Sequence, residues 1–366
     1  MTGATHEPTS GRQHRGVGLA MLAAVLFGLS APLAKLLLGQ TTPQLLAGLL
    51  YAGSGLGLLV AWIVRRRGSR TSREAPLARR DVPWLAGAIA FGGVAGPLLL
   101  MLGLVRTPAA TASLLLNLEG VLTALLAWFV FRENFDRRIA LGMVAIVAGG
   151  VVLSWEGELA VGGVAGPLAI AGACLSWAID NNLTQKVSGG DPVQVAMLKG
   201  LVAGAVNIGI ALALGARLPS VGTSAAAMAL GLASYGVSLV LFVLALRRLG
   251  TARTGAYFSL APFVGAGVSI AIFHERPTAY FLAGAALMAA GVWLHLTERH
   301  EHAHAHEAME HAHAHVHDTH HQHVHGPDDP PVTDPVPHAH PHHHEPMTHE
   351  HAHYPDLHHR HGHDAG

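Results

Sequence analysis

The chain has 366 residues, of which 51% are hydrophobic and only 13% are charged, and its formal net charge at neutral pH is zero. Soluble globular domains average about 25% charged residues, so the composition excludes an ordinary soluble protein and indicates a membrane protein. The balanced charge says nothing about partners, because 12 of the 23 acidic residues lie in the last part of the chain, between Glu298 and Asp364.

Ten apolar runs, most of them close to the length of about 20 residues that crosses a bilayer, follow one another along the chain. They lie at residues 16–38, 43–64, 84–105, 109–131, 139–155, 164–184, 193–214, 225–246, 251–273 and 279–297. The sequence therefore predicts an all-α integral membrane protein with ten transmembrane helices, the first of which is retained rather than cleaved as a signal peptide. Small residues in Gly92-Gly93-x-x-Gly96 and Gly200-x-x-x-Gly204 are of the kind that lets helices approach closely.

Two stretches of this chain repeat each other in one register, 142 residues apart. Residues 106–151 align with residues 248–293 without a gap, and Gly142 and Gly149 match Gly284 and Gly291. An internal repeat in a hydrophobic chain is typical of secondary transporters. We therefore expect two five-helix repeats, at residues 16–155 and 163–297, between an N-terminal segment (1–15) and a C-terminal tail (298–366).

The basic residues predict the orientation, because short cytoplasmic loops are rich in lysine and arginine. With the N-terminus inside, 16 such residues fall in cytoplasmic segments, against Arg106, Arg217 and Arg276 on the opposite side. Five spans per half is an odd number, so the two halves must be inverted. The prediction is a multi-pass protein of a bacterial inner (plasma) membrane with both termini cytoplasmic and with a site near the midplane, between the halves.

From residue 16 to 297 the chain resembles the EamA-type drug/metabolite transporter superfamily. The resemblance rests on residues 113–128, Ser-Leu-Leu-Leu-Asn-Leu-Glu-Gly-Val-Leu-Thr-Ala-Leu-Leu-Ala-Trp, followed by Arg132-Glu133, and on the counterpart that runs from Ser259-Leu-Ala-Pro-Phe to His274-Glu275. The family often has a proline in the fourth span of each half; Pro262 matches it and Gly120 does not, so a bend shared by both halves stays open. The resemblance implies transport of small organic solutes, commonly export, with no single substrate.

Ionisable residues inside a span are costly and by default mark function. Glu119 lies near the middle of the fourth span, where apolar surroundings disfavour its charged form, and could load and release a proton during transport. Asn117 precedes it by two residues and so lies on a different helical face. The alternative for Glu119 is a structural carboxylate bonded to a neighbouring helix.

A second polar group is predicted near the cytoplasmic ends of spans six and seven. Asp180 and Lys199 fall at equal depth, about 10 Å from the membrane edge at 1.5 Å per residue, and pairing would make both charges tolerable. Asn181 adjoins Asp180, and Arg253 competes as a partner. The pair is either a fixed structural ion pair or part of a binding site or gate. Elsewhere, we expect Lys35 to snorkel to the outer interface, and Glu133 and Glu275 to have a structural role at helix ends, such as pairing with a loop arginine.

The tail is rich in histidine, with 24 of the 28 histidines lying between His300 and His363. Its proline and acidic residues oppose a packed core, so we expect disorder. Imidazole binds zinc, nickel, cobalt and copper. The candidate ligands are His302, His304, His306, His311, His313, His320, His321, His323, His325, His342, His343 and His344.

These features favour a secondary transporter that moves a small organic metabolite or drug by alternating access, with export and proton coupling as hypotheses and no required cofactor. The alternatives are a divalent-metal transporter fed by the tail, or a non-transporting sensor that uses the tail to report metal. The sequence shows no nucleophile–base pair or phosphate loop, so we expect no enzyme. It offers no surface for nucleic acid, because its basic residues flank membrane spans. The expected partners are the lipid bilayer and a small solute, and a homodimer is compatible with the sequence.

Overall fold

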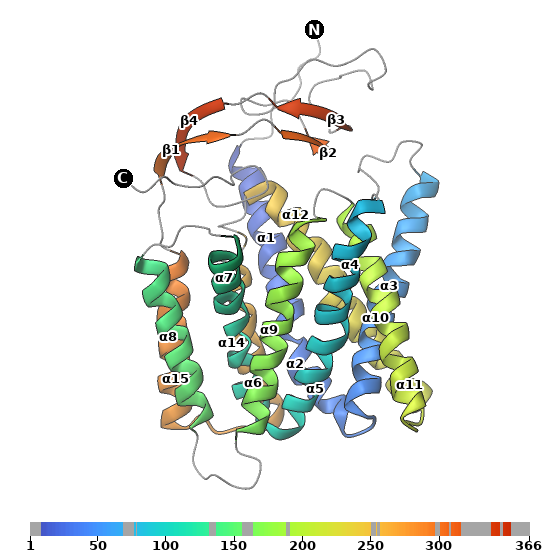
Figure 1. Ribbon diagram of the computed structural model, residues 1–366. Helices are drawn as coiled ribbons and strands as arrows, with labels where there is room; N and C mark the ends of the chain where they lie inside the picture. Colours follow the sequence, from blue (N-terminus) through green and yellow to red (C-terminus); the bar gives the residue numbers. More distant parts are fainter. Residues whose placement is uncertain are drawn as a thin grey trace.

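In a computed structural model, ten spans form one helical bundle (Figure 1). The structure describes residues 9–68, 77, 79–131, 137–155, 164–187, 191–249, 254, 257–296, 301–306, 309–315, 338–344 and 347–352. The first half contains α1 (Thr9–Gly28), α2 (Ser30–Leu38), α3 (Pro43–Gly68), η1 (Arg79–Asp81), α4 (Val82–Ala88), η2 (Ile89–Ala95), α5 (Gly96–Arg106), α6 (Ala109–Leu115), α7 (Leu118–Phe131) and α8 (Arg137–Ser154). The second half contains α9 (Ala165–Gln185), α10 (Pro192–Ala213), α11 (Val221–Gly231), η3 (Leu232–Val237), α12 (Ser238–Leu249), α14 (Ala261–Phe273) and α15 (Ala279–Leu296).

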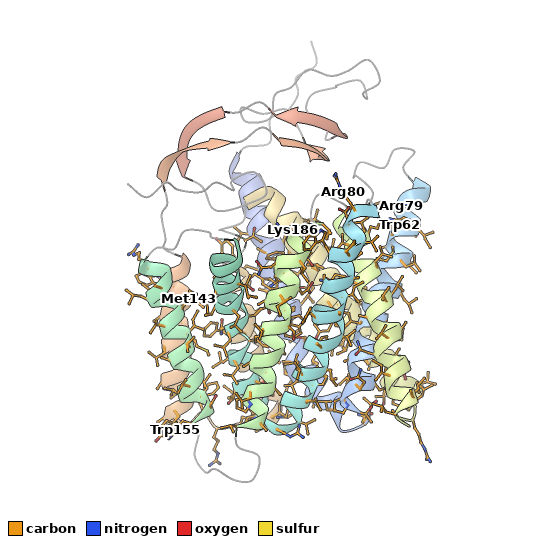
Figure 2. The ribbon with its side chains drawn as sticks, viewed as in Figure 1. Trp62, Arg79, Arg80, Met143, Trp155 and Lys186 are labelled. Carbon is orange, nitrogen blue, oxygen red and sulfur yellow. The ribbon has the colours of Figure 1, made fainter. Side chains whose placement is uncertain are left out.

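The predicted all-α membrane class is confirmed for this bundle. In the part of the chain that the structure describes, six helical spans are long and apolar enough to cross a membrane, and three shorter apolar helices accompany them. The remaining span is α9, whose apolar run is interrupted by Asp180, Asn181 and Asn182. Arg79, Arg80 and Lys186 lie at one end of the bundle and Trp155 lies at the other end (Figure 2). These three basic residues are among those that the sequence assigned to one common side of the membrane.

The two halves are interleaved, and each span packs mainly against a span of the other half. Helix α3 lies along α10, α8 along α15, and α6 along α14. Helix α1, the first span of the first half, packs on α12, part of the third span of the second half. In the same way α9, the first span of the second half, packs on α5, part of the third span of the first half. A twofold relation between the halves requires that such contacts occur in equivalent pairs.

Four glycines of the repeat show that this relation is inverted. Gly149 packs against Gly284, with the Gly284 carbonyl oxygen 2.8 Å from where a Cβ on Gly149 would stand. Gly291 packs in the same way against the carbonyl of Gly142. The repeat thus converts one contact into the other, because Gly149 and Gly284 are matched by Gly291 and Gly142. Moving from Gly142 to Gly149 along α8 runs from Gly291 to Gly284 along α15, so the two helices are antiparallel.

A side chain at this contact is expected to destabilise the bundle. In Gly149→Val, the new Cβ would stand 2.7 Å from Met288 Cγ and 2.8 Å from the Gly284 carbonyl oxygen, so the two helices must separate. Overpacking of this kind costs about 1–3 kcal/mol. We expect a lower melting temperature in detergent. Gly267→Ala is the control, because nothing lies within 4 Å of the added Cβ; equal melting of the two variants would contradict the close contact.

Both halves carry the same irregularities, which extends the repeat beyond the stretch that sequence comparison detects. The fourth span breaks in a turn at Leu116–Asn117, and the ninth span turns at Ser259–Leu260, one residue from the equivalent position. The third and eighth spans each contain a π-helical segment, η2 and η3, at matching positions. The bend that the sequence left open is therefore shared, although only the second half has a proline there.

The described parts of the tail contain four strands, β1 (Glu301–His306), β2 (Met309–His315), β3 (His338–His344) and β4 (Met347–Ala352). Strand β1 pairs with β4, and β2 with β3, both antiparallel. The alternation of His and Ala in β1 and β2 has the two-residue period of a strand. The side chains of these strands, and His320, His321, His323 and His325 altogether, lie outside the described residues.

Candidate functional site

A proline in span three creates the centre of the site by removing a backbone donor. In η2 the amide of Gly96 donates to the carbonyl of Phe91, five residues back, instead of to Gly92. The next amide would belong to Pro97, which has no N–H. The carbonyls of Gly92 and Gly93 are therefore left without helical partners in the middle of a membrane span, where an unpaired carbonyl is costly.

Side chains from three other helices satisfy these two carbonyls. The Tyr51 hydroxyl (α3) and the Trp177 indole Nε1 (α9) both donate to the Gly92 oxygen, at 2.7 and 3.0 Å. Asn207 Nδ2 (α10) donates to the Gly93 oxygen at 2.8 Å, and Gln44 Nε2 donates to Asn207 Oδ1 at 2.8 Å. Span two of the first half, and spans six and seven of the second half, are thus fixed to span three by hydrogen bonds.

Asp180 and Lys199 form an ion pair beside these carbonyls, as the sequence predicted from their depth. Lys199 Nζ lies 2.6 and 2.7 Å from the two carboxylate oxygens, and the Thr184 hydroxyl donates to Asp180 at 2.8 Å. The Asp180 side chain is 9% exposed and that of Lys199 is 15% exposed. Asp180 also packs directly against Gly92, where a Cβ would overlap the carboxylate. The pair is therefore seated against the π-helical segment.

Glu119 and Asn181 form the second half of the site. Asn181 Nδ2 donates to Glu119 Oε1 at 2.9 Å and contacts the Thr123 hydroxyl at 3.4 Å. Glu119 is half-buried, Asn181 is exposed, and a Cβ on Gly120 would have nothing within 4 Å. Among the described residues no lysine or arginine forms an ion pair with Glu119. Asn181, which bonds Glu119, directly follows Asp180, which bonds Lys199, on α9.

The remaining predicted site residues lie apart from this group. Asn117 is buried and turns the other way, donating to the Leu114 carbonyl at 2.9 Å and contacting Met288 Sδ at 3.8 Å. Asn117 and Glu119 thus have partners on different helices, α15 and α9. Arg253 lies outside the described residues.

Sequence reasoning missed Tyr51, Trp177 and Asn207, which lie next to the charged residues. Each is a common membrane-helix residue with no local pattern around it. The available signal was Pro97 after Gly92-Gly93, because a proline four or five residues after a carbonyl leaves that carbonyl in need of a partner from another helix.

At the end of the bundle opposite to Lys186, two charged side chains lie between the halves. Glu275 accepts hydrogen bonds from the backbone amides of Ala109 and Ala110, at 2.9 and 3.0 Å, and so caps the start of α6. Lys35 donates to the Thr107 carbonyl and lies 5.9 Å from the centre of the Phe273 ring. The structural role expected for Glu275 fits, but its partners are amides rather than an arginine. Lys35 was expected to extend to the membrane–water interface, but its ammonium group instead bonds a backbone carbonyl in the turn between α5 and α6.

In the part of the chain whose side chains are described, no three His, Cys, Asp or Glu residues come together as a metal site. The single cysteine, Cys174, is buried and its thiol faces the Leu115 carbonyl at 3.7 Å. The arrangement as described is one of carboxylates, amides, a lysine and aromatic rings, which can bind a small polar solute and exchange protons with it.

Known proteins share both this sequence and this fold. The EamA-like transporter family matches residues 14–155 and again residues 164–297. The chain belongs to this family. A crystal structure of another protein has the same fold, with a TM-score of 0.57 and 21% identity, over 76% of this chain and 94% of that one.

Three relatives are named as transporters. An uncharacterized transporter of Methanothermobacter thermautotrophicus is 29% identical over 80% of this chain and 90% of its own length. A probable amino-acid metabolite efflux pump of Salmonella typhimurium is 30% identical over 76% of this chain and 93% of its own. A probable terminal-alkyne amino-acid exporter of Streptantibioticus cattleyicolor is 29% identical over 59% and 73%. This EamA-family protein is therefore a multi-pass membrane transporter of small metabolites, and not an enzyme.

Proposed function

We propose that this protein exports an amino acid or a close derivative, in exchange for protons, by alternating access. The observation that carries the proposal is that two adjacent residues of α9 bind opposite charges. Asn181 bonds Glu119, which has no basic partner among the described residues, and Asp180 holds Lys199. Two of the relatives are named for amino-acid export, and an amino acid carries the complementary pair of charges.

The geometry suggests how such a zwitterion would be bound. Its ammonium group would take the place of a proton at Glu119, with Asn181 orienting the carboxylate. Its own carboxylate would bind Lys199 in competition with Asp180. Ammonium and proton then exclude each other at Glu119, and this exclusion is what couples the movement of a substrate in one direction to that of a proton in the other.

The inverted halves supply the movement. Sites at the interface of inverted repeats are exposed to each side in turn when one half rocks against the other. The basic end of the bundle is proposed to face the cytoplasm of a bacterial cell, with the plasma membrane as the location. Glu275 and Lys35, which tie the halves together at the other end, would then close the outer side.

Counterflow in proteoliposomes tests this function without depending on its direction. Vesicles loaded with unlabelled L-phenylalanine, L-leucine or L-alanine are diluted into the same labelled amino acid at equal pH. We expect rapid uptake of label by exchange, above that of protein-free vesicles. Absence of exchange with all three amino acids would contradict an amino-acid substrate, and would be the result expected of a non-transporting sensor.

A second proposal concerns the tail, which we propose binds divalent metal ions as a cytoplasmic buffer or regulator. The specific observation is the strand register, which places His304 opposite His349 in one sheet and His313 opposite His340 in the other. Opposed residues in antiparallel strands are about 5 Å apart, and histidines from distant parts of the tail thus become neighbours. Such sites suit zinc, nickel, cobalt or copper.

Deletion of residues 300–366 tests the tail separately from transport. We expect the full-length protein to bind several nickel or zinc ions in a direct titration and the truncated protein to lose most of them, while amino-acid counterflow at low metal stays unchanged. A divalent-metal transporter would instead show changed cellular nickel, cobalt and zinc on deletion, together with metal flux in vesicles. Equal metal binding by the two proteins would contradict a metal-binding tail.

A further inference from the structure

Five aromatic rings follow one another through the bundle from the polar site. Tyr51 and Tyr235 have ring centres 5.3 Å apart, and Tyr235 lies 6.2 Å from Phe27. Phe27 lies 5.3 Å from Phe258, which meets Phe242 edge-on at 4.8 Å. These separations are typical of interacting rings. The set is called the aromatic row below.

The aromatic row spans the boundary between the two halves. Tyr51 belongs to α3 and Phe27 to α1, both in the first half. Tyr235 belongs to η3, Phe242 to α12, and Phe258 is the helical residue just before the turn that precedes α14. A substrate site of an inverted-repeat transporter is expected at this boundary. All five side chains keep partial exposure, in contrast to fully buried neighbours such as Ala23 and Ala24.

Tyr51 joins the aromatic row to the charged groups. Its hydroxyl is fixed on the Gly92 carbonyl, against which Asp180 also packs. The site thus has a charged pole and an aromatic pole, with Tyr51 at the junction.

Hydrogen bonds hold the second member of the row in position. The hydroxyls of Ser234 and Ser238 donate to the carbonyls of Leu26 and Ala23, at 2.7 and 2.9 Å, and so lock η3 and the start of α12 onto α1. Tyr235 lies between these serines in the sequence, and its buried hydroxyl is close to Ser30 without forming a hydrogen bond of good geometry among the described residues. A buried hydroxyl is normally paired, so a better acceptor or donor on a ligand could compete for this one.

We propose that the aromatic row is the subsite for the substrate side chain, with Tyr235 as a specificity-determining residue, and that it selects amino acids with a large apolar or aromatic side chain. The inference rests on the proposed amino-acid export, to which it adds the side-chain class. Large apolar side chains gain from leaving water against the rings, whereas the methyl group of alanine gains little.

The same counterflow assay tests selectivity, now at limiting substrate. We expect wild-type protein to exchange L-phenylalanine and L-leucine at least about tenfold faster than L-alanine, the discrimination that an apolar pocket provides. In Tyr235→Ala this preference should fall to about threefold or less, while Tyr235→Phe, which retains the ring, should keep it. Tyr280→Ala is the matched control, because Tyr280 is exposed on α15, away from the row.

The outcomes separate the inference from the function on which it rests. Equal exchange of all three amino acids by the wild type would overturn the aromatic subsite and leave amino-acid export intact. An unchanged preference in Tyr235→Ala would overturn the role of Tyr235. No exchange of any of the three would overturn both proposals. Because the readout is a ratio between substrates, partial loss of folded protein in a variant does not affect it, and the melting temperature of each variant is recorded alongside.

Discussion

Glu119→Gln is expected to remove the coupling of substrate movement to a pH gradient. In wild-type vesicles, exchange of one substrate for one proton should concentrate substrate on the acidic side by about tenfold for each pH unit, because one pH unit corresponds to 1.36 kcal/mol. Glutamine has the same shape and can still accept the hydrogen bond from Asn181, but it cannot carry a proton. The variant should therefore concentrate substrate no further than a passive carrier would, which a filtration assay with labelled L-phenylalanine measures.

The comparison that makes this result specific is counterflow at equal pH. That exchange needs no net movement of protons, so Glu119→Gln should retain part of it, reduced by the weaker hold on the ammonium group. Ser176→Ala is the control: Ser176 lies on α9 close to Asp180, and its hydroxyl bonds only the Gly172 carbonyl of its own helix. A Glu119→Gln variant that still accumulates substrate tenfold per pH unit would exclude this carboxylate as the proton carrier.

The inverted arrangement of the two halves could be predicted from the sequence. The positions of the basic residues showed which loops lie on the same side of the membrane. Because each half has five spans, an odd number, the second half must then cross the membrane in the opposite direction to the first. The glycine contacts between α8 and α15 confirm that deduction at atomic level. The pairing of Asp180 with Lys199 was also predictable, since a rise of 1.5 Å per residue places both at one depth and a membrane leaves few other partners.

The hydrogen-bonded centre of the site was not predictable in the same way. It depends on which helices adjoin span three, and hydropathy contains no information on neighbours. Tyr51 and Trp177 meet only because both reach the Gly92 carbonyl from different helices. The repeat alignment likewise matched Glu133 with Glu275 but did not show what either side chain bonds. That Glu275 caps α6 depends on the fold of both halves. Local sequence patterns thus predict the helices and their direction across the membrane. The hydrogen-bond partners within the site depend on contacts between helices that are distant in the sequence.

Substitutions of Asp180 and Lys199 are expected to separate the folding role of this ion pair from its role in transport. Removing one partner of a buried pair leaves an uncompensated charge and costs about 3–5 kcal/mol, whereas replacing both partners is often neutral. Asp180→Asn and Lys199→Met should each lower the melting temperature markedly, and the double variant should recover most of the loss. Thermal melting in detergent, monitored by size-exclusion chromatography, ranks the melting temperatures of the two single variants and the double variant.

Counterflow of the same variants then decides what the pair does. If Lys199 binds the substrate carboxylate, the double variant should be stable and yet exchange L-phenylalanine poorly, with a raised half-saturating concentration, because the charge that receives the carboxylate is gone. Recovery of both stability and exchange in the double variant would show that the pair only holds α9 and α10 together. The distinction is sharp because Asp180 and Lys199 bond each other and Thr184, so the double change leaves the Glu119–Asn181 bond in place.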